Sequence, residues 1–169
     1  MTEPVPSAAS VSQELHDPPV PDFDLNVRHW ALAALLEHWR QAHRGNALPR
    51  RADISPAQFG RAMPYVSMID VAGEPPRYRW RLICSQVTRR LGRDLTGKWF
   101  DEIYPPAVVE RLGAVYGLSL QHRVAIRFCG TMAFAGKSHL PYESVHMPLV
   151  NDEDRIVMLM IGVHLGRQH

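Results

Sequence analysis

Histidine and glutamate side chains are the residues of this sequence that could bind a metal ion. His139, Glu143 and His146 are close enough in sequence to suggest such a site. Metal ligands must converge in a tight geometry, and alternate residues of a strand face opposite ways. Glu143 would therefore point away from His146 in the strand expected here, and we expect no metal at these residues. The nine histidines offer no distinctive haem ligand, so the sequence names no cofactor.

The cysteines, Cys84 and Cys129, lack the spacing of a zinc or redox motif. Cys84 is close in sequence to Arg81 and Arg89, which could stabilise a thiolate. A nucleophile also needs an oriented base, and no neighbouring motif supplies one. We expect Cys84 to be a packing residue at the end of a strand, and the sequence does not predict an enzyme.

Arginines are concentrated in one stretch of the chain, and they suggest a candidate anion site. Guanidinium groups suit phosphate and carboxylate, so an acidic ligand or a nucleotide could bind there. The alternative is a solvated strand face and helix surface. The formal net charge of +2 is small and does not predict a nucleic-acid partner. The candidates are Arg79, Arg81, Arg89 and Arg93.

Residue patterning predicts one α+β domain over residues 26–169, preceded by a disordered tail over residues 1–25. The expected helices cover residues 26–44, 86–91 and 106–121, and the expected strands cover residues 65–71, 78–83, 124–134, 142–147 and 156–165. No apolar run approaches the ~20 residues of a membrane span, and the N-terminus lacks the pattern of a signal peptide. We therefore expect a cytoplasmic protein without a membrane partner.

The last expected strand is apolar on both faces, so both faces must be covered. The first expected helix has an apolar stripe that also needs burial. The helix could lie across its own sheet, or helices and sheets of two chains could pack as a two-fold homodimer. The candidate interface residues are Leu32, Leu35, Leu36 and Trp39 on the helix, and Ile156, Met158 and Met160 on the strand.

The order of elements resembles a PAS domain, in which helices separate the second and third strands of a five-stranded antiparallel sheet. Residues 48–56, LPRRADISP, look like the LPxRxDIxP opening of a bacterial, alphaproteobacterial-type PAS-like family. Residues 91–97, LGRDLTG, look like its GRDLTG turn. The resemblance covers about residues 27–165 and implies such a sheet, and the apolar stripe of the N-terminal helix predicts that this helix covers it.

The resemblance implies a sensory or signalling module that acts through contacts with another protein, such as a sensor kinase. A small molecule could occupy its core; the alternatives are a ligand-free scaffold and the anion or nucleotide binder described above. The candidate pocket residues are Trp80, Leu82, Val87, Phe128, Met132, Val145, Met147, Leu159 and Ile161.

Overall fold

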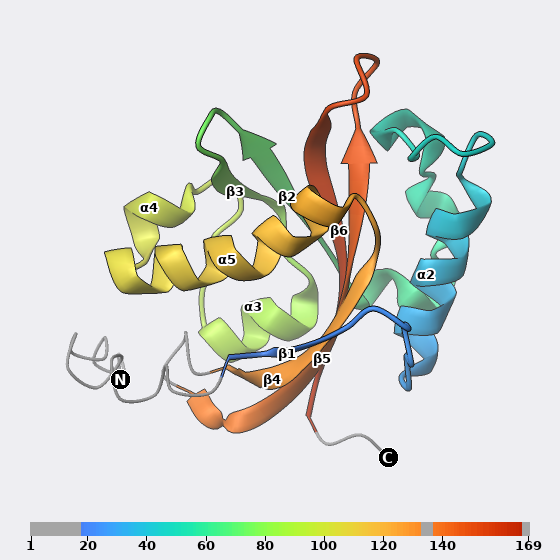
Figure 1. Ribbon diagram of the computed structural model, residues 1–169. Helices are drawn as coiled ribbons and strands as arrows, with labels where there is room; N and C mark the ends of the chain where they lie inside the picture. Colours follow the sequence, from blue (N-terminus) through green and yellow to red (C-terminus); the bar gives the residue numbers. More distant parts are fainter. Residues whose placement is uncertain (1–17, 133–136, 167–169) are drawn as a thin grey trace.

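One antiparallel sheet organises the chain, and helices lie on both of its faces (Figure 1). The computed structural model describes residues 18–132 and 137–166. The strands are β1 (Val20–Asp22), β2 (Val66–Ala72), β3 (Arg77–Leu82), β4 (Ile126–Met132), β5 (Lys137–Val150) and β6 (Ile156–Leu165). Their spatial order is β1-β4-β5-β6-β2-β3, which places β5 and β6 in the centre and β1 and β3 at the edges.

The sixth strand corrects the prediction of a five-stranded sheet. β1 lies inside the segment assigned to the disordered tail, and it pairs with β4, with Val20 opposite Cys129. Three residues flanked by Pro19 and containing Pro21 carry no readable alternation, although proline is tolerated in an edge strand. The rest of the predicted tail, residues 1–17, lies outside the described residues.

The first described helix, α2 (Trp30–Gln41), packs on β5 and β6. Leu32 and Leu35 of this helix contact β6 at Gly162, where a Cβ atom would lie only 3.2 Å from Cγ of Leu32. Trp39 donates from its indole nitrogen to the carbonyl of Pro148 at 2.9 Å. The missing Cβ of Gly162 thus allows the helix and the sheet to approach closely.

Three helices occupy the other face of the sheet (Figure 1). They are α3 (Ser85–Leu91), α4 (Phe100–Ile103) and α5 (Pro106–His122). α3 stops at Gly92, whose φ of 72° is the left-handed conformation that glycine adopts readily at a helix end. Short 3₁₀ helices, η1 (Arg51–Asp53), η2 (Pro56–Gln58) and η3 (Gly60–Tyr65), connect α2 to β2. None of the described helices has the length and apolarity that a membrane span requires.

The sheet separates two apolar clusters, and β6 contributes to both, as its two apolar faces predict. Met158 and Met160 join the cluster beneath α2, whereas Leu159 and Ile161 join the cluster beneath α3, α4 and α5. Alternation of side chains along a strand therefore decides which layer each residue packs against.

The outer edge of β3 is covered by the segment that precedes α4. The amide of Trp80 donates to the carbonyl of Lys98 at 3.0 Å, and the amide of Gly97 donates to the carbonyl of Trp80 at 2.6 Å.

Candidate functional site

A cavity of about 70 Å³ lies between α5 and the sheet, in the layer that also holds α3. Its walls come from β2, β3, β4, β5 and β6, from α3 and α5, and from the segment that leads into β1. Most of the lining is apolar or aromatic. The lining residues are Pro19, Ser67, Trp80, Val87, Arg111, Leu112, Val115, Tyr116, Thr131, Met132, Tyr142, Ser144, His146, Ile161, Val163 and Leu165.

His146 is the most unusual residue in this wall. It comes from β5, is buried, and lies beside the rings of Tyr116 and Phe128, at centroid distances of 5.1 and 4.5 Å. One ring nitrogen, Nε2, is 3.0 Å from Oγ of Ser144, while Nδ1 is buried and has no hydrogen-bond partner among the described residues. Burial lowers the pKa of His146 to about 3, so the ring is neutral at neutral pH.

Two tyrosines in the wall are also held in their neutral forms. Burial raises the pKa of Tyr116 well above its ordinary value, and nearby Tyr104 adds to this shift. Burial likewise raises the pKa of Tyr142, while the guanidinium of Arg111 acts in the opposite direction. The inner part of the cavity therefore disfavours charge.

The segment before β1 closes one side of the cavity through a close approach at Gly130 of β4. A Cβ atom at Gly130 would lie 3.3 Å from Cα of Pro19 and 3.3 Å from Cε1 of Tyr142. Pro19, Tyr142 and the neighbouring Thr131 all line the cavity. The glycine thus allows the segment before β1 and the side chain of Tyr142 to pack closely against β4 at this wall.

Ser67 connects the cavity to the start of α3. Its Oγ accepts a hydrogen bond from the amide of Cys84 at 2.9 Å, and both residues are buried. Cys84 packs in the cluster beneath α3, α4 and α5, just after β3 and at the N-cap of α3. This is the packing position expected for that cysteine.

The structure places four of the nine predicted pocket residues, Trp80, Val87, Met132 and Ile161, in the cavity wall. Leu159 and Phe128 are buried outside the lining, the first in the same apolar cluster and the second against the ring of His146.

The other three predicted pocket residues belong to the opposite side of the sheet. Val145 and Met147 pack beneath α2 because β5 turns its apolar residues to that helix and its polar residues to the cavity. Leu82 packs there too, since a register shift between Met68 and Ile69 interrupts the alternation of the β2–β3 pair.

Sequence reasoning missed Ser144, His146, Tyr116 and Arg111 as wall residues. The available signal was the alternation of β5 itself, in which Tyr142, Ser144 and His146 share one face. The predicted pocket residues Val145 and Met147 belong to the opposite, apolar face of this strand.

The predicted interface residues lie inside the chain. Leu32, Leu35, Leu36, Trp39, Met158 and Met160 are buried in the cluster beneath α2, and the partly buried Ile156 packs against it. Of the two arrangements considered for this stripe, the structure has the helix lying on its own sheet. These side chains are therefore not available on the surface for a second chain.

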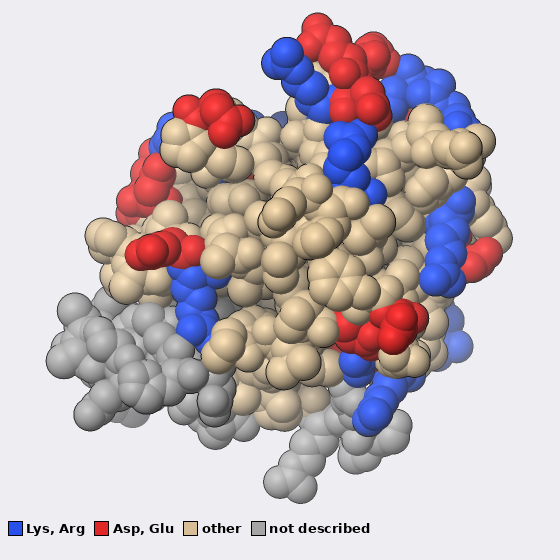
Figure 2. Space-filling view, viewed as in Figure 1, with Lys and Arg blue, Asp and Glu red and all other residues tan. Residues whose placement is uncertain are grey.

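The predicted anion-site arginines do not gather into one site. Arg79 pairs with Asp70 at 2.8 Å, and its guanidinium lies 5.0 Å from the ring centre of Trp99. Arg81, Arg89 and Arg93 are exposed. On the face shown in Figure 2, acidic side chains lie beside basic ones rather than leaving one basic patch.

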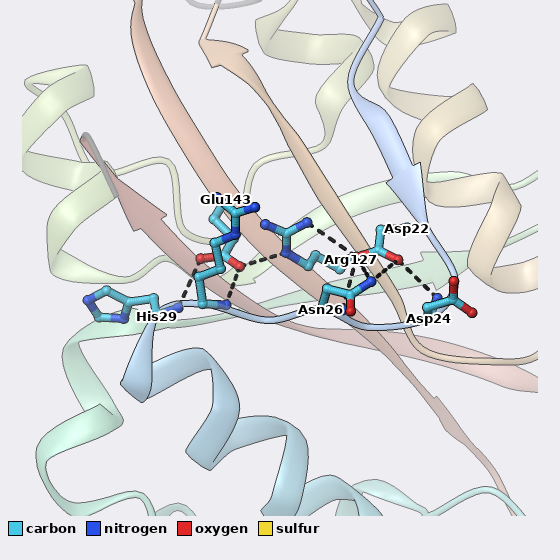
Figure 3. A network of polar contacts seen from close by, with 7 residues as sticks. Asp22, Asp24, Asn26, His29, Arg127 and Glu143 are labelled. Atoms are coloured by element: carbon cyan, nitrogen blue, oxygen red, sulfur yellow. Dashed lines mark hydrogen bonds and ion pairs between the residues drawn. The ribbon is translucent and has the colours of Figure 1, made fainter. Parts of the chain in front are cut away.

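A buried ion-pair network lies on the α2 side of the sheet (Figure 3). Glu143 is fully buried and accepts hydrogen bonds from Arg127 Nε at 2.6 Å and from the amides of Arg28 and His29 at 2.8 and 3.1 Å. Burial favours the neutral acid, but these bonds outweigh it and lower the pKa of Glu143. Arg127 also reaches Asp22 of β1, at 3.3 Å.

This network explains why Glu143 and His146 do not share a site. Glu143 accepts hydrogen bonds from the backbone amides at the start of α2, whereas His146 lines the cavity on the other face of β5. The side chain of His139, the third residue weighed as a metal ligand, lies outside the described residues.

The comparisons with known proteins agree with this architecture. A family model described as PAS domain matches residues 27–163, and the chain belongs to this family. No curated protein and no solved structure matches the chain significantly. PAS domains are sensory or signalling modules that mediate protein–protein interactions.

Proposed function

We propose that this protein is a PAS-type sensory module that holds a small molecule in the cavity beneath α5 and reports its presence to a partner protein. The observation that carries the proposal is His146, a neutral, buried imidazole in the cavity wall with one nitrogen that has no partner in the described part of the chain. An unpaired buried polar atom is costly, and a ligand that supplies its partner recovers that cost.

The partner is a signalling protein, such as a sensor kinase, or a second copy of the chain. Because the apolar stripe of α2 is buried, such a partner has to use another surface. Exposed apolar side chains include Phe23 after β1 and Trp30 at the start of α2, which are 48% and 50% exposed. Exposed aromatic residues of this kind are typical contributors to protein interfaces.

Native mass spectrometry and absorption spectroscopy of freshly purified protein test the ligand part. Val115 lines the cavity, whereas its neighbour Ala114 is exposed on the same helix. We expect wild-type protein and Ala114→Phe to carry or take up a small molecule, and Val115→Phe to lose it while keeping its circular dichroism spectrum.

A wild-type chain that neither retains a molecule nor gains thermal stability from any member of a broad ligand library would contradict the sensory role. A ligand-free PAS scaffold would then be the better description.

A further inference from the structure

The hydrogen bond between Ser144 and His146 limits what the cavity wall can offer a ligand. Both residues are buried on the cavity face of β5, and Oγ of Ser144 lies 3.0 Å from Nε2 of His146. Within the described residues, this Oγ has no other hydrogen-bond partner, and Nδ1 of the imidazole has none. A neutral imidazole carries one ring N–H, so two arrangements of the pair have to be compared.

The two arrangements differ in how many groups they leave unpaired. If Nε2 carries the hydrogen and donates to Ser144, both the hydroxyl hydrogen and the lone pair of Nδ1 lack a partner. If Ser144 donates to Nε2 instead, the N–H at Nδ1 is the one unpaired group. Because unpaired buried polar groups are destabilising, the second arrangement is favoured. His146 therefore presents a hydrogen-bond donor, and the group that pairs with it has to be an acceptor.

The surroundings of this donor favour an uncharged acceptor. Burial holds Tyr116 and Tyr142 in their neutral forms, and Trp80 and Leu112 add apolar surface to the same wall. Arg111 also lines the cavity, but it already takes part in an interaction within the protein. Transferring a carboxylate from water to such surroundings costs far more than transferring a carbonyl group.

The volume of the cavity restricts the size of the ligand. The cavity of about 70 Å³ is less than half the roughly 150 Å³ of an engineered apolar cavity that binds benzene. It therefore suits a short branched chain or a single small ring, whereas larger ring systems do not fit.

We propose that the cavity selects small uncharged carbonyl compounds, whose oxygen accepts a hydrogen bond from Nδ1 of His146 and whose apolar part fills the remaining space. This inference rests on the proposed ligand-binding function and narrows it to one chemical class, that of short ketones, aldehydes, esters and amides. Ser144 is a positioning residue, because its hydroxyl group keeps the ring hydrogen on Nδ1.

NMR titration of the full-length protein with three probes of similar size tests the assignment. Cyclopentanone carries the carbonyl, methylenecyclopentane replaces the oxygen with a CH₂ group, and pyrrole donates a hydrogen bond but accepts none. We expect His146→Leu to reduce the affinity for cyclopentanone relative to methylenecyclopentane by about tenfold, the effect of one hydrogen bond to a buried donor. The affinity for pyrrole relative to methylenecyclopentane should stay unchanged or rise.

A control variant and a spectroscopic measurement separate recognition from a general effect on the fold. His122→Gln should keep the wild-type ratios, because His122 is exposed and lies outside the lining. Nitrogen-15 spectra of the histidine rings show which nitrogen carries the hydrogen. We expect Nδ1 of His146 to carry it in the wild type and its signal to shift with cyclopentanone but not with methylenecyclopentane. Ser144→Ala should abolish the preference for this tautomer.

The outcomes distinguish this inference from the proposed function. The carbonyl assignment is wrong if Nε2 carries the hydrogen when cyclopentanone is bound, if His146→Leu weakens pyrrole rather than cyclopentanone, or if the broad library yields ligands but no carbonyl compound binds. In each of these cases the cavity remains a ligand site. If no probe binds and the broad library also fails, the ligand-binding function itself is wrong. If His146→Leu does not fold, the spectra of the wild type decide.

Discussion

Glu143 is a buried carboxylate that connects β4, β5 and the start of α2. It holds the start of α2 through two backbone amides and pairs with Arg127 of β4, so it joins two strands and a helix at one point (Figure 3). A buried ion pair contributes little net stability, but removing one partner leaves an uncompensated charge in the interior.

We therefore expect Glu143→Gln to lower the free energy of unfolding by about 3–5 kcal/mol, measured by urea denaturation. Replacing both partners, Arg127→Met with Glu143→Leu, should cost less than the sum of the single changes, because neither charge of this pair is left buried without the other. Asp22 then loses its contact with Arg127 but keeps its hydrogen bonds with Asn26. Glu153→Gln is the control: Glu153 is exposed and 3.7 Å from Arg155, so its loss should change stability by at most about 0.5 kcal/mol. Equal effects of Glu143→Gln and Glu153→Gln would contradict the role given to the network.

At the scale of elements, the contact between α2 and β6 depends on the missing side chain at Gly162. A methyl group there would lie 3.2 Å from Leu32 Cγ and 3.3 Å from Leu35 Cδ1, so the helix would have to move. We expect Gly162→Ala to destabilise the domain by roughly 1–3 kcal/mol, the usual range for an overpacked core.

Thermal unfolding measures the loss of stability expected for Gly162→Ala. Gly113→Ala is a control in this measurement, with an expected effect of opposite sign. Gly113 lies within α5, and its added Cβ would meet Tyr78 only at 3.8 Å, an ordinary contact. Alanine is the better helix former, so this variant should be neutral or more stable. An unchanged midpoint for Gly162→Ala would show that α2 can shift at little cost.

Local sequence signals predicted much of the chain between β2 and α5. Gly92 ends α3 in the left-handed conformation, and Asp94 accepts a hydrogen bond from the amide of Thr96 at 2.9 Å, as expected for such a turn. β6 is buried on both faces, as its two apolar faces require. These features depend on residues close together in sequence, so the sequence shows them directly.

The features that could not be predicted depend on contacts between distant segments. The first helix is predicted to begin at residue 26, but it begins at Trp30 with His29 as its cap, and Asn26 bonds to Asp22 instead. Alternation along β5 shows which residues share a face of the strand. Which of the two faces packs against α5 depends on the arrangement of the whole sheet. Apolarity alone pointed to the wrong face, because the polar face of β5 lines the cavity.

For the molecule as a whole, one buried and one partly buried histidine make stability depend on pH. Burial lowers the pKa of His146 to about 3, and burial together with nearby His164 lowers the pKa of His29, although Glu143 opposes this shift. Below pH 6.5, the ordinary pKa, the unfolded chain binds protons that the folded chain does not, so stability falls as the pH falls.

From His146 alone, we expect the free energy of unfolding to drop by about 2 kcal/mol between neutral pH and pH 5. His146→Phe should make this acid limb shallower when urea denaturation is repeated across the pH range. His122→Gln, at an exposed position at the end of α5, should keep the wild-type slope. An unchanged slope in His146→Phe would contradict a buried neutral imidazole.

The two edges of the sheet also bear on how the protein behaves at high concentration. An unpaired strand edge is a template for another chain, and long exposed edges lead to aggregation. Here the segment before α4 forms hydrogen bonds with the outer edge of β3, and β1 lies along β4 (Figure 1).

A chain that lacks residues 1–25 would lose β1 and expose the backbone groups of β4 from Arg127 to Cys129. We expect this variant to form soluble oligomers or fibrils in light scattering and thioflavin assays. A chain that lacks only residues 1–17, and therefore keeps β1, should remain monodisperse. The main effect of the three residues of β1 would then be to prevent self-assembly through the edge of β4.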